Sequence, residues 1–235
     1  MSTTHPGEPH VSGWSSRLNW LRAGVLGAND GIVSVAGIVM AAAGATTDTA
    51  PIAIAGGAGL VAGALSMAVG EYVSVSTQRD SERALLRKER RELAELPEAE
   101  LDELAAIYRD KGLSEKLARE VAVQLTAHDA LGAHAEAELG IDPDELARPW
   151  QAAFASLISF TVGALLPLLA ILLPPPSWRI AVTVGSVVLA LLLTGWISAR
   201  LGRAPRARAI ARNIGGGCLA MAISYGVGTL IGHAI

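Results

Sequence analysis

Carboxylate, thioether and imidazole side chains occur in this sequence at spacings that favour metal ions. Asp30 lies in the middle of a stretch, Ala23 to Gly44, that carries no other charge. Such a stretch is long enough to cross a bilayer, and a charged side chain at the centre of a spanning helix costs about 2.5 to 3.5 kcal/mol on insertion scales. A carboxylate that persists there faces a cavity, a partner or an ion, so Asp30 is the first candidate functional residue.

A second apolar stretch offers further ligands. Met67 and Glu71 stand four residues apart, on one face of a helix, and Asn29 precedes Asp30. Together they would line one polar track if the two helices are neighbours. Oxygen ligands suit Mg, Ca and Mn, and an added sulfur moves the preference toward softer ions such as Fe(II). The alternatives are that Met67 fills the core and that Glu71 lies near the membrane interface.

Glycines are frequent in these two stretches. They include Gly31 and Gly37 in the first, and Gly59 and Gly63 in the second form a small-xxx-small pair. Small residues at such spacing let helix backbones approach closely. Both helices are therefore expected to pack tightly against neighbours.

Glutamates outside the apolar stretches form a second candidate site. Glu89 and Glu92 are three residues apart, as are Glu100 and Glu103, on the two sides of Pro97. An antiparallel helical hairpin about Pro97 would bring the two pairs opposite one another. Four carboxylates in a small volume repel unless they are protonated, paired with bases or bridged by a cation.

Further along the chain, His134 and Glu138 form an i, i+4 pair with the spacing of metal ligands. Inward-facing Glu and Glu/His pairs are how helical bundles build carboxylate metal sites. The alternative is an ordinary solvated surface, because exposed helices often alternate charge. The bases interleaved with the first acids are Arg87, Lys88, Arg90 and Arg91.

Composition places the chain among membrane proteins. It is 51% hydrophobic and only 17% charged over 235 residues, which is too apolar for an ordinary soluble domain. Five stretches reach the roughly 18 to 20 residues that a spanning helix needs. They are residues 18–44, 51–77, 151–173, 178–199 and 209–233. The predicted fold is an all-α polytopic membrane protein with five transmembrane helices.

A helical insert separates the second and third spans. No Gly or Pro lies between Gly70 and Pro97, so the second span is expected to continue as a long helix. A second helix is predicted over residues 98–111, and a third from the N-cap Ser114 to about Leu139. The predicted domains are a polar tail at 1–17, two spans at 18–78, an acidic metal-binding domain at 79–148, and three spans at 149–235.

Basic residues set the expected orientation. Arginines flank the first span, follow the second and fill the link between the fourth and fifth, all on one side if the spans alternate. The positive-inside tendency makes that side the cytoplasm. The N-terminus and the insert are then cytoplasmic and the C-terminus lies outside. We expect a cell inner membrane, because no targeting extension is evident, or a vacuole-type membrane as the alternative.

Other function classes find little support. No glycine-rich phosphate loop follows a strand, and the membrane serines lack a His and Asp in any evident arrangement, so no enzyme is expected. The basic residues at the membrane edge are better explained by anionic lipid than by nucleic acid. The single cysteine, Cys218, excludes an intrachain disulfide.

Three stretches resemble a known family, and the NDG and SMAxGEYVSV strings in the first two are specific. They are LRAGVLGANDGIVSVAGIVMAAAGA at 21–45, GALSMAVGEYVSVSTQRDSE at 63–82 and HDALGAHAEAELGI at 128–141. With the three-span tail, the sequence resembles the vacuolar iron transporter family over nearly its whole length after residue 17. The resemblance implies a homodimer of five-span subunits that moves Fe(II), often Mn(II), out of the cytoplasm in exchange for protons along the subunit interface.

The resemblance also implies roles for individual residues. Asp30 of the NDG string and Met67 of the SMA string match pathway residues, with Glu71 beside them. The two Glu-x-x-Glu pairs and Glu138 match ligands of the family's cytoplasmic metal-binding domain. Family members can carry Met one turn before that last Glu, where this chain has His134. An imidazole still ligates, but it adds pH sensitivity near its ordinary pKa of about 6.5 and leaves the metal preference open.

Transport by a homodimer agrees with ligand number and charge. One subunit offers about three pathway side chains, and a two-fold axis doubles them toward the six or more ligands that hard cations take. Protons compete with a divalent ion for the same carboxylates, which would couple the two fluxes. No permanently bound cofactor is expected. Alternatives are a primarily manganese exporter and a membrane-anchored metal sensor or buffer.

Overall fold

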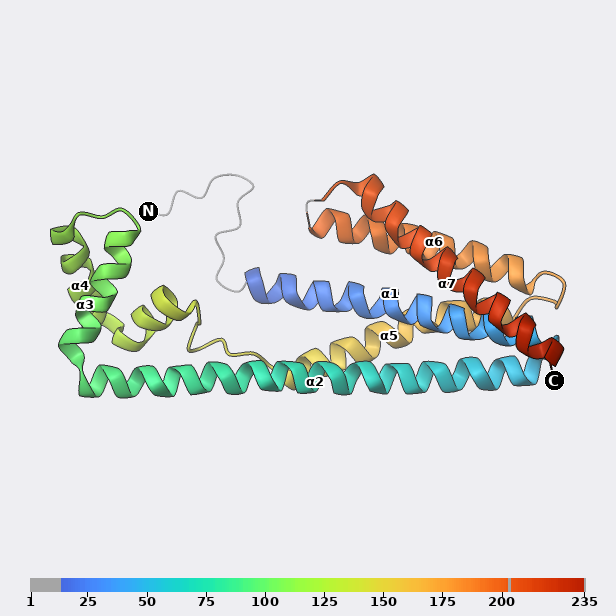
Figure 1. The fold of residues 1–235 in the computed structure, drawn as a ribbon, viewed down its shortest axis with the longest axis horizontal. Coiled ribbons are helices and arrows are strands. Elements are labelled where there is room, and N and C mark those ends of the chain that lie inside the picture. The colour runs from blue at the N-terminus through green and yellow to red at the C-terminus, as the bar shows by residue number, and fades with distance from the viewer. Residues whose placement is uncertain (1–13, 203, 235) are drawn as a thin grey trace. The chain divides into compact units, whose positions relative to one another are not determined.

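The computed structural model describes residues 14–202 and 204–234, and in these ranges all regular structure is helical, with no strand. The prediction of an all-α chain is thus confirmed for the described residues, whereas residues 1–13 of the predicted tail lie outside them. In chain order, the elements in Figure 1 are α1 (Trp14–Ala45), α2 (Thr49–Glu95), α3 (Pro97–Asp110), α4 (Glu115–His134), the π-helical turn η1 (Ala135–Leu139), α5 (Pro149–Leu172), α6 (Arg179–Leu201) and α7 (Arg206–Ala234).

The chain divides into two compact units. The described residues up to Tyr72 and from Trp150 onward form the first, here called the apolar unit. Val73–Pro149 form the second, here called the insert. The long helix α2 contributes to both units, because it runs without interruption from Thr49 to Glu95, as the absence of Gly and Pro after Gly70 predicted.

Among the described residues, five helices are long and apolar enough to cross a membrane. They are α2, α5, α6, α7 and the part of α1 over Gly24–Ala45. Their most apolar 18-residue windows have mean hydropathies from 1.6 to 2.3. None of the predicted spans extends more than one residue beyond its helix. The hydropathy pattern therefore located these helices correctly.

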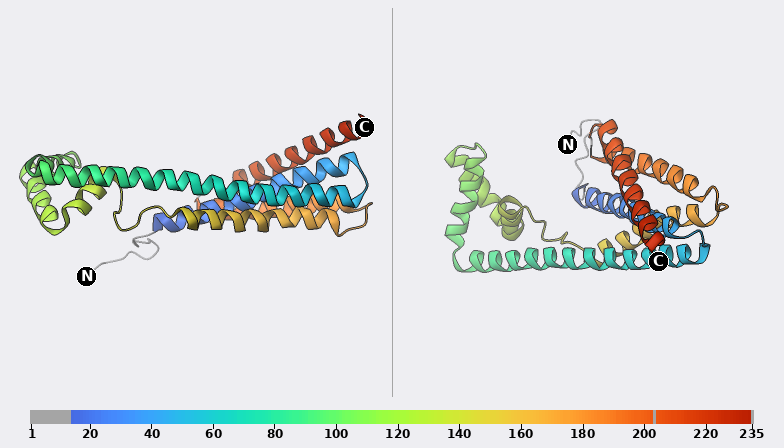
Figure 2. Two further views of the ribbon diagram at one scale, coloured as in Figure 1. Left: turned by 90° about the horizontal axis from the view of Figure 1, so that it is seen from below. Right: turned by 45° about the vertical axis from the view of Figure 1, so that its right-hand side comes forward.

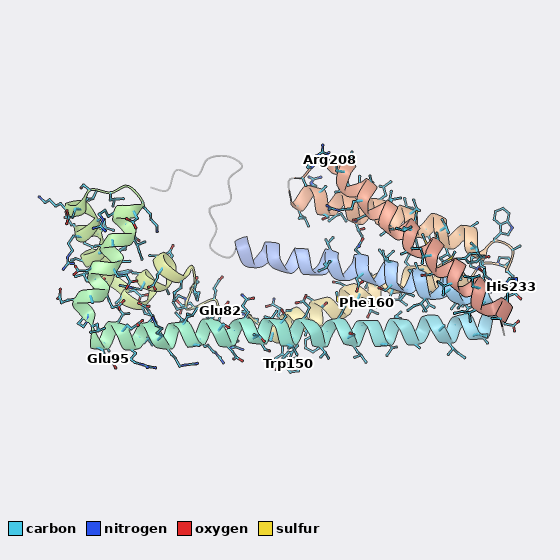
Figure 3. The ribbon with its side chains drawn as sticks, in the orientation of Figure 1. Glu82, Glu95, Trp150, Phe160, Arg208 and His233 are labelled. Atoms are coloured by element: carbon cyan, nitrogen blue, oxygen red, sulfur yellow. The ribbon has the colours of Figure 1, made fainter. Side chains whose placement is uncertain are left out.

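Helix α1 is central to the apolar unit and makes backbone contacts through glycine. A Cβ added at Gly31 would collide with the carbonyl oxygen of Phe160 on α5, whose side chain is labelled in Figure 3. Gly163 of α5 is packed against the α1 backbone in the same way, and Gly228 of α7 is packed against the carbonyl of Ala41. The expected tight helix packing is present, and it involves α5 and α7 as well as α2.

Two adjacent faces of α1 bury apolar side chains in separate clusters. One face packs with α6 and α7, which lie beside α1 in Figure 1 and Figure 2. The other face packs with α2 and α5. Main contributors are Ile32, Ala36, Met40, Leu191 and Met221 in the first cluster, and Val35, Val39, Ile52, Phe160 and Ile171 in the second. With both faces covered, the position of α1 is fixed by its neighbours.

A buried arginine joins the start of α6 to the connection between α1 and α2. Arg179 donates hydrogen bonds to the Thr47 carbonyl oxygen at 3.1 Å and to Thr49 Oγ1 at 3.0 Å. Its side chain is 4% exposed. Because a buried guanidinium left without partners would be costly, these contacts hold the short connection in place.

Two helices and a π-helical turn make up most of the insert beyond α2. α2 ends two residues before Pro97, which is the first residue of α3. Ser114 accepts a hydrogen bond from the Leu117 amide at 3.4 Å and caps α4, as predicted. Across the helices, Arg119 of α4 pairs with Asp102 of α3. The hairpin of the insert is thus made by α3 and α4. The antiparallel hairpin expected about Pro97 is not formed, because α3 turns away from α2 there instead of running back along it (Figure 1).

The third predicted helix is not continuous. Asp129 has φ −157° and ψ 94°, and its Oδ1 accepts a hydrogen bond from the Gly132 amide at 3.0 Å. This side chain therefore caps a second helical segment, which ends in the π-helical turn and in Gly140 at φ +64°. The kink comes from an aspartate acting as an N-cap inside a helical pattern. His134 lies on the segment that follows the kink.

Substituting alanine for Gly31 is expected to destabilise the apolar unit by roughly 1 to 3 kcal/mol, because the new Cβ meets backbone atoms that cannot rotate away. Gly57→Ala on α2 is the matched control, since a Cβ there meets nothing within 4 Å. Thermal unfolding in detergent measures both. Equal melting temperatures for the two variants would contradict the proposed contact.

Candidate functional site

A cavity of about 470 Å³ in the apolar unit is lined by residues of α1, α2 and α7. Its polar lining consists of Asn29 and Asp30 from α1 and Arg212 and Asn213 from α7. Met67 of α2 also lines this cavity, and it packs as well against the apolar cluster of α1, α2 and α5, as the core-filling alternative expected. A carboxylate, two amides and a thioether therefore share one space between apolar helices.

Asp30 is oriented by its own helix. Ser34, one turn later, donates a hydrogen bond from Oγ to Asp30 Oδ1 at 3.0 Å. This is the single hydrogen bond of the Asp30 carboxylate among the described residues. The second carboxylate oxygen, Oδ2, accepts no hydrogen bond from the described residues.

Asn29 connects three helices. Its Oδ1 accepts hydrogen bonds from Thr194 Oγ1 on α6 and from Asn213 Nδ2 on α7, each at 3.3 Å. These bonds join residues 165 and 184 positions apart in the sequence. The amide thereby fixes the relative placement of α1, α6 and α7 beside Asp30.

A second cavity, of about 320 Å³, is lined by α1 and α7, two of the three helices that line the first. Val33 lines both cavities, and the polar groups of the second are Ser34 of α1 and Ser224 of α7. The two cavities form a track along α1 and α7 that contains one carboxylate and, further along, hydroxyl groups.

Among the residues predicted for this site, Asn29, Asp30 and Met67 line the same cavity. Glu71 is half-buried on α2 and is not part of the cavity wall. Sequence reasoning missed Ser34, Thr194 and Asn213. The i, i+4 spacing from Asp30 was a signal for Ser34, and an amide in an apolar helix was a signal for Asn213. No pattern in the sequence pointed to Thr194.

The insert contains a compact group of possible ligands. Glu89 of α2, Glu100 of α3 and His134 of α4 each offer one ligand atom, and these atoms lie within 4.8 Å of one another. His134 Nδ1 is 3.1 Å from Glu89 Oε1 and 3.6 Å from Glu100 Oε2. The three residues are 3%, 6% and 0% exposed, in that order. The turn at Pro97 and the packing of α4 against α3 therefore bring one glutamate from each predicted pair into contact with the histidine.

These buried atoms lack ordinary hydrogen-bond partners. Neither ring nitrogen of His134 has an aligned hydrogen bond, and the same holds for Glu89 Oε1 despite its short distance to the ring. Buried polar groups are almost always paired, so this group needs an explanation. Two carboxylates and an imidazole are suitable ligands for a divalent first-row transition metal.

The local electrostatics also favour a cation. Burial, followed by repulsion from Glu138 and Glu100, raises the pKa of Glu89 to about 7. Burial and then repulsion from Glu103 raise the pKa of Glu100 and of Glu138. Burial lowers the pKa of His134. The fold therefore disfavours every charged form in the group, and a bound cation would reverse this for the carboxylates.

The other three predicted ligands surround this group without joining it. Glu92 pairs with Lys88 at 2.8 Å, one turn earlier on α2. Glu103 and Glu138 are exposed, although their charges act on the buried glutamates. The solvated-surface alternative thus describes part of the set. Metal binding by any of the six residues stays a prediction.

The long apolar helices, one of which carries a carboxylate into a cavity, define a helical membrane protein with ligand groups suited to divalent cations. A family model described as the VIT family matches residues 21–229. The chain therefore belongs to the VIT family, as its motifs predicted.

Individual relatives agree over almost the whole chain. The "Vacuolar iron transporter" of Acanthamoeba castellanii is 46% identical over 225 residues, which cover 95% of this chain and 83% of the relative. "Vacuolar iron transporter homolog 4" of Arabidopsis thaliana is 37% identical over 220 residues, covering 93% and 87%. "VIT-like transporter 1b" of Glycine max is 35% identical over 227 residues, covering 96% and 82%. None of these names describes an enzyme.

Removing one buried ligand of the insert should weaken metal binding. Loss of even an outer-shell partner typically costs about 10-fold to 100-fold in metal affinity, so Glu89→Gln and His134→Ala are each expected to lower Co²⁺ affinity at least about tenfold. The visible absorption of Co²⁺ bound to the full chain in detergent measures it. Glu120→Gln, which changes an exposed carboxylate of α4, is the control. Equal affinities for wild type and both ligand variants would contradict the site.

The stability of the metal-free insert should depend on Glu89 in a defined pH window. Its pKa rises from 4.5 to about 7 on folding, so between these values the folded state binds more protons than the unfolded state. The Glu89 contribution therefore lowers stability as pH rises through this window. With a chelator present, the advantage of Glu89→Gln over wild type should grow from pH 5 to pH 8.

Comparing wild type with Glu89→Gln isolates the contribution of Glu89 to stability from that of His134. The lowered pKa of His134 acts oppositely, because it makes stability rise with pH. Helix content during chemical denaturation provides the measurement. An advantage that shrinks as pH rises would contradict the assignment.

Proposed function

We propose that this protein transports divalent transition-metal ions across a membrane, with Fe(II) as the principal cargo and Mn(II) as a second. The observation that carries the proposal is Asp30, a carboxylate held half-buried in a cavity between apolar helices and shared with Met67. The cost of a charge within the hydrocarbon is offset where it meets a cation. The names of the relatives support iron as the cargo.

The proposed topology has five spans, formed by α1, α2, α5, α6 and α7. The N-terminus and the insert lie in the cytoplasm and the C-terminus lies outside, because the arginines near the span ends, except the buried Arg179, cluster at one end of the spans. The ion then leaves the cytoplasm, either across a cell inner membrane or into a vacuole-like compartment.

Two copies would complete the pathway. One copy of the cavity offers the carboxylate of Asp30 and the thioether of Met67, too few ligands for a cation. A two-fold axis along the α1 and α7 track would double them. Beyond Asp30, the hydroxyls of Ser34 and Ser224 in the second cavity continue the polar lining. We infer a homodimer whose pathway runs between the subunits.

Proton exchange follows from the same carboxylates. A divalent ion binds the deprotonated form, and protonation from the acidic side releases it. Return of the empty site is easier with a neutral side chain than with a buried charge. The proposed mechanism is therefore metal/proton antiport.

The insert has a separate role in this proposal. Its buried group of Glu89, Glu100 and His134 would collect metal ions on the cytoplasmic side, since a cation relieves the repulsion among the carboxylates. That group alone would also serve a membrane-anchored metal buffer or sensor, which is the second candidate function. Asp30 separates the two, because an anchor has no use for a carboxylate within the spans.

Uptake of Fe²⁺ and Mn²⁺ into proteoliposomes tests the main proposal. Asp30→Asn should reduce uptake to the level of empty vesicles, since the isosteric amide removes the charge that attracts the ion. Asp48→Asn, an exposed carboxylate in the connection between α1 and α2, should transport as wild type does. Unchanged uptake by Asp30→Asn would support the buffer instead. Competition between the two ions would show whether manganese is the main cargo.

An imposed pH gradient tests the coupling. Vesicles with an acidic interior should accumulate metal faster than vesicles without a gradient, and they should lose internal acidity as metal enters. An internal pH dye and a metal-sensitive dye record the two fluxes together. Wild-type uptake that ignores the gradient would contradict antiport while leaving metal transport itself in place.

A further inference from the structure

The side chains around the Asp30 cavity differ in their ability to bind a cation. Leu26 and Val33 are apolar, Gly216 and Gly217 carry no side chain, and Arg212 has donors only. Lone pairs that can face a metal ion therefore belong to Asp30, Met67 and the two asparagines. The two asparagines differ in whether the amide oxygen already accepts hydrogen bonds.

The amide oxygen of Asn29 is already in hydrogen bonds to neighbouring helices. A carbonyl oxygen has two lone pairs. Asn29 Oδ1 accepts from Asn213 Nδ2, and it shares the single hydroxyl hydrogen of Thr194 with the Leu191 carbonyl oxygen, since both oxygens lie 3.3 Å from Thr194 Oγ1. Asn213 uses its amide nitrogen in this contact, and its Oδ1 accepts no hydrogen bond from the described residues. Nor is that oxygen among the fully buried atoms that lack a partner. The available amide oxygen is therefore on α7.

We propose that Asn213 is an ion-contacting residue of the pathway, that its amide oxygen joins the Asp30 carboxylate and the Met67 thioether around the ion, and that Asn29 and Thr194 are positioning residues. The assignment rests on the proposed transport function, and it adds α7 to the helices that contact the ion. The ion site then draws on α1, α2 and α7. Asn29 acts through Asn213 and makes no contact with the ion.

The amide oxygen should affect ion selectivity. Oxygen ligands favour hard ions such as Mn²⁺, and thioether sulfur favours soft ions such as Cd²⁺. Without the Asn213 oxygen, the soft ligand has more weight in the remaining set. Because the amide is uncharged, its loss leaves the net charge of the site unchanged. Loss of Asn213 should therefore change ion selectivity, whereas loss of Asp30 should abolish uptake.

Mn²⁺ uptake by proteoliposomes, with Cd²⁺ as competitor, tests the proposal. Asn213→Ala should raise the KM for Mn²⁺ by about tenfold and should lower the Cd²⁺ concentration that halves Mn²⁺ uptake. Met67→Leu should shift the competition the other way. Asn213→Asp keeps an oxygen and adds a negative charge but loses the amide donor to Asn29, so the Cd²⁺ concentration that halves Mn²⁺ uptake should not fall below that of wild type. An Asp variant as impaired in selectivity as the Ala variant would overturn the proposal, because the donor and not the oxygen would then matter.

A double-mutant cycle separates contact from positioning. Asn29→Ala alone should shift the competition in the same direction as Asn213→Ala, by a smaller factor. In the Asn213→Ala background it should add no further shift, because its target is gone. A further shift there would make Asn29 an ion contact and overturn the assignment.

The controls keep this inference apart from the transport proposal. Wild type without uptake of any ion would remove the transport function itself. Wild type that transports and Asp30→Asn that does not, together with an Asn213→Ala variant whose competition matches wild type, would leave transport standing and reject Asn213. Melting temperatures within a few degrees of wild type confirm that the variants compared are folded.

Discussion

The close approach of α1 to its neighbours is the constraint on which the rest of the apolar unit depends. At Gly31 and Gly163 the backbones of α1 and α5 touch, and at Gly228 the backbone of α7 meets α1. Gly31 is the residue directly after Asp30. A side chain at that position would separate α1 from α5, and the displacement would also move the carboxylate relative to Met67 and Asn213. The absence of a Cβ at one position therefore helps to set the dimensions of the cavity at the next.

The two candidate sites differ in how many carboxylates they bring together and in what surrounds them. In the apolar unit a single carboxylate shares its cavity with neutral side chains and with the Arg212 guanidinium, so the net charge is small, and Ser34 orients the carboxylate. In the insert several carboxylates are crowded together and burial adds to their repulsion. The first arrangement suits an ion that passes through, because few strong interactions must be broken. The second suits an ion that is captured, because binding removes a strain that the fold has built in.

Much of the fold could be predicted from local patterns. Hydropathy located the five long helices, and the lack of Gly and Pro after Gly70 predicted the length of α2. Pro97 and Ser114 marked the ends of helices through backbone chemistry that acts over a few residues. The kink at Asp129 was missed because an aspartate in a helical pattern has the same appearance whether it faces solvent or caps a new segment. Only its bond to the Gly132 amide distinguishes the two.

The sites were less predictable, for reasons of distance and burial. Glu89 and Glu92 are equivalent in the Glu-x-x-Glu pattern, yet one is buried against His134 and the other pairs with Lys88. Spacing gives the two residues of a pair almost the same helix face, and tertiary packing decides between them. The bonds of Asn29 to Thr194 and Asn213 span more than 160 residues, beyond the reach of any local pattern.

The guanidinium of Arg179 has a practical consequence for work on this molecule. Arg179 is hydrogen-bonded to both Thr47 and Thr49, so the turn between them is held at both sides. An epitope inserted in this turn would break these hydrogen bonds and separate the turn from α6. A point replacement is the gentler choice. Asp48 is exposed, and the chain's one thiol, Cys218, is half-buried. A cysteine introduced at position 48 in a Cys218→Ala background would therefore give a single reactive handle for determining sidedness with impermeant reagents.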